Sequence, residues 1–265
     1  QVADAVVSVG SAYGTARILA TRKAVEKAGL NMIHFMRSPD AAILGHSLEH
    51  GSAEEKNVLI FDLGAGELNV SVLTVEYGIH ETKAHRGSNV GGVDFDNNLM
   101  DDVLVSDHVC CLRALFSLGR VLLLTTCLQY FVFVQGDVSL WIMHDASHTS
   151  ARRSGKLPEN LDMVAVHQLR LLCEQAKRRL SSFPYADITF DPRLPGLKSN
   201  SRSFEIFETR VSRDAFEAMI ADRITMFDSV VRKTLTDAGM TVGQIEEVIL
   251  VGGSTRIPKV QQVGR

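Results

Sequence analysis

The order of apolar and polar residues predicts strands and helices that alternate along the chain. Short apolar or β-branched runs predict strands over residues 5–9, 57–62, 70–76, 79–82 and 248–251. Apolar residues at helical spacing predict helices over residues 15–29, 164–180 and 216–235. Ser212 is expected to cap the third helix, and Ser254, Thr255 and Pro258 indicate the start of another. This alternation favours an α/β fold.

Residues 106–150 depart from this pattern, because they are apolar without a stable period. Residues 121–136 contain no charged side chain, but this run is shorter than the roughly 18 to 20 residues of a membrane-spanning helix, so a membrane span is not favoured. A retained non-coding stretch explains the block better than an insert that a partner covers. His144 and His148 would share one face of a helix, but no third ligand has a recognisable spacing, and we predict no metal site there.

Composition excludes several classes of protein. The 265 residues are 45% apolar and 22% charged, which is the balance of a globular protein, and the net charge of -3 argues against a nucleic-acid partner. Four cysteines are too few for a disulfide scaffold and have no zinc-site spacing, so a reducing compartment such as the cytoplasm is expected. The chain begins at Gln1 without the pattern of a signal peptide, and we expect it to be a piece of a longer protein.

Two glycine turns carry candidate chemistry. Asp62 ends a buried strand and is followed by Gly64 and Gly66, a pattern in which backbone N–H groups face phosphate and the carboxylate orients hydrated Mg²⁺. Residues 252–256 repeat the arrangement of strand, glycine turn and helix start, where a flat ring or a phosphate can approach the backbone. Each turn alone is equally well an ordinary loop. Together they suggest a nucleotide held between two turns.

Four strings occur in a fixed order along the chain, namely NVLIFDLGAGELNVSVLTVEYGI, NVGGVDFDN, LLCEQAKRRLSS and EEVILVGGSTRIPKVQQ. They resemble the ATPase domain of the 70-kDa heat shock protein family, the DnaK-type chaperones. The resemblance implies an actin-like ATPase fold of two ribonuclease H-like lobes, with an incomplete lobe I and most of lobe II. It assigns residues 1–52 to the C-terminal half of the lobe I core, 53–91 and 212–265 to the first part and the truncated second part of the lobe II core, and 92–211 to an outer subdomain of lobe II that holds the atypical insert of about 106–150.

The resemblance implies a site for ATP or ADP, with Mg²⁺ held indirectly through water and phosphate. The residues that match the family's nucleoside contacts are Gly91, Gly92, Asp94, Glu174, Lys177, Arg178, Ser181, Gly252, Gly253, Ser254, Arg256 and Ile257. The four on the predicted helix of residues 164–180 and just beyond it share one face, because they stand at i, i+3, i+4 and i+7. Without the resemblance, a solvated helix face with salt bridges is the preferred interpretation of these charges.

The phosphate side departs from the family. Asp62, Gly64 and Gly66 match the second phosphate loop, whereas substitutions stand at Ser38 for the catalytic glutamate, Ala65 for glycine, Glu67 for threonine and Asn69 for aspartate. Alanine at a positive φ would cost about 1 kcal/mol. The Glu67 carboxylate would repel phosphate oxygens, and loss of a charge-stabilising group commonly slows a reaction by roughly a hundredfold or more. We therefore expect weak or no hydrolysis.

The resulting hypothesis is a fragment of the nucleotide-binding domain of an ATP-binding chaperone that is impaired in hydrolysis. Its expected partners are nucleotide and, in the full-length protein, J-domain co-chaperones, nucleotide exchange factors and unfolded clients, but not nucleic acid. Two alternatives stay open. One is a non-hydrolysing regulatory or interaction module, and the other is a degenerate gene product with a retained non-coding insert. A sugar kinase or an actin-like filament fits less well, because the string LLCEQAKRRLSS matches neither.

Overall fold

The computed structural model describes residues 3–11, 13–50, 54–77, 79–103, 163–190 and 207–263. The predictions for the block 106–150, including the membrane-span and histidine-pair alternatives, lie outside these residues. The described part is a mixed α/β structure, as the alternation predicts. Of its helices, none combines the length and the apolar character that crossing a bilayer requires.

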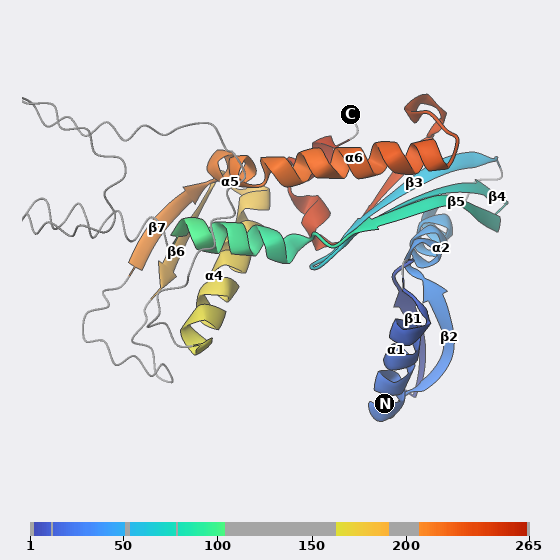
Figure 1. The fold of residues 1–265 in the computed structure, drawn as a ribbon, viewed down its shortest axis with the longest axis horizontal. Helices are drawn as coiled ribbons and strands as arrows, with labels where there is room; N and C mark the ends of the chain where they lie inside the picture. Colours follow the sequence, from blue (N-terminus) through green and yellow to red (C-terminus); the bar gives the residue numbers. More distant parts are fainter. Residues whose placement is uncertain are drawn as a thin grey trace, which may run out of the picture.

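The N-terminal residues form a βαβ unit followed by a helix. Strand β1 (Asp4–Val9) pairs in parallel with β2 (Asn31–Arg37), and α1 (Thr15–Lys27) connects them. Helix α2 (Ser38–His50) follows β2 directly and leads to the main sheet (Figure 1). The strand over residues 5–9 and the helix from residue 15 are confirmed, whereas β2 and α2 are additions that the apolar pattern did not predict.

The main sheet has the order β5-β4-β3-β8. Its strands are β3 (Lys56–Leu63), β4 (Leu68–Glu76), β5 (Ile79–Ser88) and β8 (Glu247–Val251). The pairs β3–β4 and β4–β5 are antiparallel, and β3–β8 is parallel. The predicted strands are confirmed, although β5 extends six residues beyond its predicted end at residue 82.

Both faces of β3 are covered, which explains the continuous apolar run of this strand. On one face, the ring of Phe227 from α6 (Ala221–Asp237) lies 6.1 Å from that of Phe61 and 6.2 Å from that of Phe95. On the other face, Ile43 of α2 packs with alternate β3 residues, Val58 and Ile60. Successive side chains of a strand point to opposite faces, so a strand covered on both sides is apolar at every position.

A second group of elements extends the first core. It contains a helix over residues 92–103, α4 (Met163–Ser182), the antiparallel strands β6 (Tyr185–Phe190) and β7 (Phe207–Ser212), and α5 (Arg213–Met219). The apolar face of α4 is formed by Leu169, Cys173, Ala176 and Leu180, all of them buried. The prediction of a helix over residues 164–180 is therefore confirmed, and its apolar spacing is the reason that it packs here.

The predicted single helix over residues 216–235 is wrong, because α5 and α6 are separate helices that meet at Ile220. Ile220 has φ -100° and ψ 3°, outside the helical region. The carbonyl of Met219 accepts a hydrogen bond from the Asn98 amide at 3.2 Å, so this carbonyl has a partner outside the helix. The predicted cap is confirmed, since Ser212 Oγ accepts from the Ala215 N–H at 3.1 Å.

The predicted helix start after β8 is also corrected. The chain forms two short 3₁₀ turns there, η2 (Gly253–Arg256) and η3 (Val260–Gln262), in place of an α-helix. Between them Ile257 is extended, with φ -68° and ψ 123°. The next residue is Pro258, which disfavours helical dihedrals in the residue that precedes it, so the helix cannot begin at Ser254 and continue.

Candidate functional site

Three glycine turns meet at the carboxyl ends of β3 and β8. The Gly92 N–H donates to the Gly64 carbonyl at 3.0 Å, and the Val93 N–H donates to the Ala65 carbonyl at 2.8 Å. The hydroxyl of Ser254, in the turn after β8, donates to the same Gly64 carbonyl at 3.2 Å. The residues that follow β3, begin the helix over 92–103 and follow β8 thus form one hydrogen-bonded surface.

Glycine is required in this surface because backbone segments touch. Gly252 has φ 89°, and a Cβ atom on it would lie 2.3 Å from the Leu63 carbonyl oxygen. A Cβ on Gly91 would lie 2.5 Å from the Ala65 carbonyl oxygen. Gly252 and Gly253 are themselves exposed, so the turn after β8 offers a stretch of backbone without side chains.

Lys177 fastens helix α4 to this surface. Its ammonium donates to the Gly92 carbonyl at 2.9 Å and lies 2.8 Å from the Asp96 carboxylate. Asp96 is only 4% exposed. Burial raises the pKa of Asp96, and the hydrogen bond and charge of Lys177 oppose that rise in part. Sequence reasoning missed Asp96, although it stands two residues after Asp94 in the string NVGGVDFDN.

The other predicted residues of α4 lie differently. Arg178 is 76% exposed in its side chain and donates to Glu174 Oε1 at 2.6 Å. Ser181 Oγ donates to the Lys177 carbonyl within the same helix, at 3.4 Å. Glu174 and Arg178 therefore form a surface ion pair of the kind expected for a solvated face, whereas Lys177 points into the glycine surface.

The remaining predicted nucleoside residues divide into structural and exposed ones. Asp94 accepts a hydrogen bond from the Gly91 N–H at 2.9 Å, and Ile257 is 2% exposed in the main core. Ser254 is buried, while Arg256 is exposed beside it. Of these side chains, that of Arg256 is exposed and that of Asp94 is half-buried.

The phosphate side predicted from the sequence is a group of acidic and amide side chains. Asp62 is directly opposite Asn69 in the β3–β4 pair, so both side chains lie on one face of the hairpin. The Asn69 amide donates to Glu67 Oε1 at 3.1 Å. Burial, and secondly the charge of Glu67, raise the pKa of Asp62.

The strain expected at Ala65 is absent. Among the described residues other than glycine, Tyr77 alone has a positive φ, of 49°. The four-residue turn closes through the Gly64 N–H, which donates to the Glu67 carbonyl at 3.0 Å. This turn does not need a left-handed residue at position 65, so alanine is accommodated there without the backbone cost that the sequence suggested.

Ser38 and Asp62 line the same hollow, of about 500 Å³, between α2 and the ends of β3 and β8. The Ser38 hydroxyl donates to the Val9 carbonyl at 3.1 Å, which joins the start of α2 to the end of β1. Nearby, His46 Nε2 lies 2.8 Å from Glu247 Oε1. The structure thus brings together two positions that the sequence predicted on the phosphate side.

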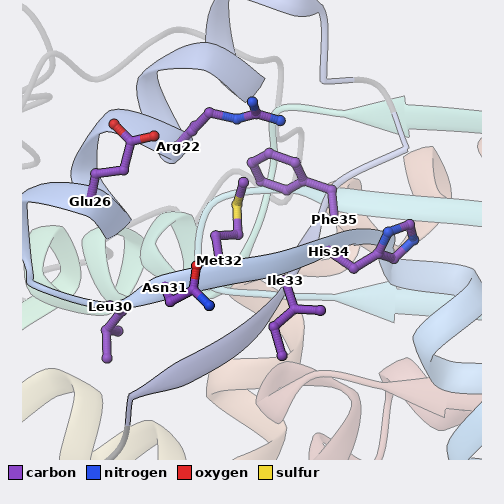
Figure 2. A pocket seen from close by; sticks show the side chains of 8 residues that line it. All are labelled: Arg22, Glu26, Leu30, Asn31, Met32, Ile33, His34 and Phe35. Atoms are coloured by element: carbon purple, nitrogen blue, oxygen red, sulfur yellow. The ribbon is translucent and has the colours of Figure 1, made fainter.

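A second hollow, of about 440 Å³, lies along β2 and α1 in the N-terminal unit. Figure 2 shows Arg22 and Glu26 of α1 above the side chains of β2. The Arg22 guanidinium lies 5.7 Å from the centre of the Phe35 ring. None of the predicted site residues lines this hollow.

The described residues contain no group of three or more histidine, cysteine, aspartate or glutamate side chains that would hold a metal ion. A divalent cation beside Asp62 would therefore take most of its ligands from water or from a bound phosphate. That coordination suits Mg²⁺, which usually keeps several waters.

Comparison with known proteins identifies the family. The family described as Hsp70 protein matches residues 1–108 and 143–264. The chain is 32% identical over 263 residues to a heat shock 70 kDa protein of Neurospora crassa, covering 99% of this chain and 33% of that protein. It is 30% identical over 264 residues to a chaperone protein dnaK of Gracilaria tenuistipitata, covering 99% and 34%. It is 31% identical over 265 residues to the chaperone protein DnaK of Trichormus variabilis, covering 100% and 31%.

The chain therefore spans about a third of the length of these curated relatives. The residues between the two matched stretches, 109–142, fall within the atypical block of 106–150. The family binds ATP or ADP with Mg²⁺ and has an actin-like ATPase fold, in agreement with the mixed α/β structure seen here. By this match over most of its length, the chain belongs to the Hsp70 family.

Proposed function

We propose that this chain is part of the nucleotide-binding domain of an Hsp70-type chaperone, and that it holds ATP or ADP between α4 and the turn at Gly252 and Gly253. The observation that carries the proposal is the meeting of three glycine turns on one surface, with Lys177 fastening α4 to it. A backbone without side chains admits the flat face of a base. Glu174 and Arg178 offer exposed polar groups on the helix beside it.

In this proposal the N-terminal residues 1–52 belong to lobe I and the remaining elements belong to lobe II. Residues 53–91 and 212–265 form the lobe II core, and residues 92–211 its outer part. Asp62 would face Mg²⁺ through water, and the hollow lined by Ser38 and Asp62 would lie between the lobes. A reducing compartment such as the cytoplasm suits Cys173, the free thiol of the described residues.

Binding is tested by titration calorimetry of the chain with ADP. We expect a measurable affinity that Glu174→Ala weakens by about tenfold, equivalent to about 1.4 kcal/mol, through loss of a polar contact to the ligand. Gln175→Ala is the matched control, because Gln175 is exposed on the same helix and is not among the predicted ligands. No binding of ADP at millimolar concentration would contradict the proposal.

Hydrolysis is expected to be weak, because Ser38 and Glu67 stand where the family has a catalytic glutamate and a threonine. The combined change Ser38→Glu, Glu67→Thr and Asn69→Asp in the full-length protein should raise single-turnover release of phosphate by roughly a hundredfold or more. A protein that already hydrolyses ATP as fast as the variant would show that these positions are not the defect.

The substitutions also favour a second candidate, a non-hydrolysing regulatory or interaction module. Their side chains have partners within the fold, since Ser38 donates to the Val9 carbonyl and Glu67 accepts from Asn69. Such a module would bind nucleotide and, as full-length protein, J-domain co-chaperones, exchange factors or clients without turnover. Co-chaperone binding that is equal with and without nucleotide would favour this module over a nucleotide-driven chaperone.

A further inference from the structure

We propose that Ser11 and Glu67 form a latch between the N-terminal unit of β1, α1 and β2 and the main sheet. In the latched state the Ser11 hydroxyl donates a hydrogen bond to the Glu67 carboxylate, and in the arrangement described above this bond is not made. The latch is a conformational device that sets how closely the two parts approach each other. It does not depend on which ligand the candidate site takes.

The Ser11 hydroxyl is a buried donor without a partner. Ser11 is 7% exposed, and its Oγ makes no hydrogen bond within the part of the chain that the structure describes. Its carbonyl, in contrast, accepts from the Arg37 guanidinium at 2.6 Å. An unpaired buried hydroxyl raises the free energy of the folded state, and most buried polar groups in proteins are paired. An arrangement that gives this hydroxyl an acceptor is therefore favoured.

The Glu67 carboxylate is an acceptor that Ser11 can reach. A Cβ atom on Gly10, the residue before Ser11, would lie 2.9 Å from Glu67 Oε1. Consecutive Cα atoms are about 3.8 Å apart, so a small movement brings the Ser11 side chain to this carboxylate. Glu67 Oε1 accepts from the Asn69 amide at 3.1 Å, and a carboxylate has room for more than one donor. A hydrogen bond from a hydroxyl to a carboxylate is stronger than one between neutral groups.

Gly10 allows the carboxylate to come this close to the end of β1. A side chain at this position would meet Glu67 Oε1 and, at 3.0 Å, the ring of Tyr13. The turn after β1 is held by the Tyr13 N–H, which donates to the Gly10 carbonyl at 3.0 Å. The end of β1 thus presents a fixed stretch of backbone beside the Glu67 side chain.

Helix α2 is the joint about which the two parts can turn. His80 Nε2 of β5 lies 3.1 Å from Asp40 Oδ1 at the start of α2, and His46 Nε2 of α2 lies 2.8 Å from Glu247 Oε1 of β8. These pairs attach α2 to both edges of the main sheet, so α2 moves with the sheet. The Ser38 hydroxyl joins the start of α2 to the end of β1. A bond between Ser11 and Glu67 would limit the turning of the N-terminal unit about this joint.

The latch also affects the hollow of about 500 Å³ beside α2. Ser8 of β1 and Asp62 of β3 both line it, so its walls belong to the N-terminal unit and to the main sheet. A movement of β1 toward the turn after β3 brings these walls together. The latched state should therefore have a narrower hollow.

The experiment is amide hydrogen exchange of the whole chain, measured by mass spectrometry in residues 8–11 and 64–69. Ser11→Ala removes the donor, and Glu67→Met removes both acceptor oxygens at a similar side-chain length. Each change is expected to raise the exchange rate in residues 8–11 by about tenfold, because the end of β1 then opens more easily. The double variant should exchange no faster there than either single variant, since both changes remove the same bond. Glu67→Gln keeps an acceptor oxygen and should exchange at nearly the rate of the unchanged chain.

Glu26→Met is the matched control, because Glu26 is an exposed glutamate of α1 in the other hollow and should change exchange in neither segment. Unchanged or slower exchange in Ser11→Ala would overturn the inference, because removal of an unpaired buried hydroxyl stabilises a fold. Additive effects of Ser11→Ala and Glu67→Met would overturn it too. If Ser11→Ala does not fold, Glu67→Met is compared with Glu67→Gln, and equal exchange of these two variants in residues 8–11 would overturn the latch.

Discussion

The candidate site has two ends, both close to the end of β3, and they are held together in different ways. The glycine end is the surface formed by the turns at Gly64, Gly92 and Gly252, and the carboxylate end is the group of Asp62, Glu67 and Asn69. At the glycine end, backbone groups contact one another directly, and the buried Asp96 is paired with Lys177. At the carboxylate end, the charge of Glu67 adds to burial in raising the pKa of Asp62, and Glu67 Oε1 accepts a hydrogen bond from the Asn69 amide. One end is determined by backbone packing and the other by side-chain charge.

This difference indicates at which end of the site a substitution is compatible with the fold. A change in the glycine turns moves backbone that three elements share, so such a change affects the whole core. A change at Glu67 or Asn69 alters two side chains that bond to each other at the edge of one hairpin. Substitution at the carboxylate end is therefore more compatible with folding than substitution in the glycine turns.

The largest expected loss of stability comes from a variant that disrupts the glycine end. Gly252→Val would place a side chain 2.3 Å from the Leu63 carbonyl oxygen and force a β-branched residue to a φ of 89°. We expect a loss of on the order of 4 kcal/mol in the free energy of unfolding, or failure to fold. Urea denaturation followed by circular dichroism measures this loss.

The neighbouring glycine supplies the control. A Cβ atom on Gly253 would meet no atom within 4 Å, and its φ is not positive. Gly253→Ala should therefore change the free energy of unfolding by less than about 1 kcal/mol. Equal losses for the two variants would show that the close approach at Gly252 does not hold the turn.

The second prediction breaks the ion pair of the glycine end. Lys177→Met leaves the buried Asp96 carboxylate without its cation, and we expect a loss of about 3 kcal/mol in the free energy of unfolding. Asp96→Asn in the same chain should recover most of this loss, because the unpaired charge is gone. Arg178→Met removes an exposed pair one residue away and should cost about 0.5 kcal/mol or less. A similar cost for both single variants would contradict the structural role of Lys177.

The sequence predicted β3 well, because its apolar run is buried on both faces. It predicted β8 from the same kind of run as a buried strand, but Val248 and Leu250 are exposed there. It missed β6, although Ala186, Ile188 and Phe190 alternate with exposed residues as a half-buried strand should. It also missed α2, which Pro39 starts at a position that proline favours in helices. Strand β6 has only six residues, and the burial of both elements is set by contacts with other segments of the chain.

The candidate site was predictable where a short sequence motif specifies the backbone conformation of a turn, as at Gly64, Gly92 and Gly252. It was not predictable where two segments far apart in the sequence meet. Lys177 and Asp96 are 81 residues apart, and no spacing rule connects them. The absence of strain at Ala65 could not be predicted either, because the conformation of a turn depends on the partner strand and on the Gly91 loop packed against it.

The smallest expected change in stability concerns the carboxylate end. Because burial and Glu67 raise the folded-state pKa of Asp62 above its ordinary value of 3.8, ionised Asp62 lowers stability at any pH above that raised pKa. Asp62→Asn should therefore raise the thermal midpoint at pH 7 by roughly 2 °C. The gain should shrink as the pH falls through the raised pKa, and vanish below 3.8, where the carboxyl is protonated in both the folded and the unfolded state.

Glu67→Gln removes only the charge of Glu67 and leaves the burial of Asp62, so the rise in the thermal midpoint at pH 7 should be smaller for this variant. Thermal melts at pH 7 and pH 3.5 measure the midpoints of both variants. A loss of stability for Asp62→Asn at pH 7 would show that the ionised Asp62 carboxylate does not destabilise the carboxylate end.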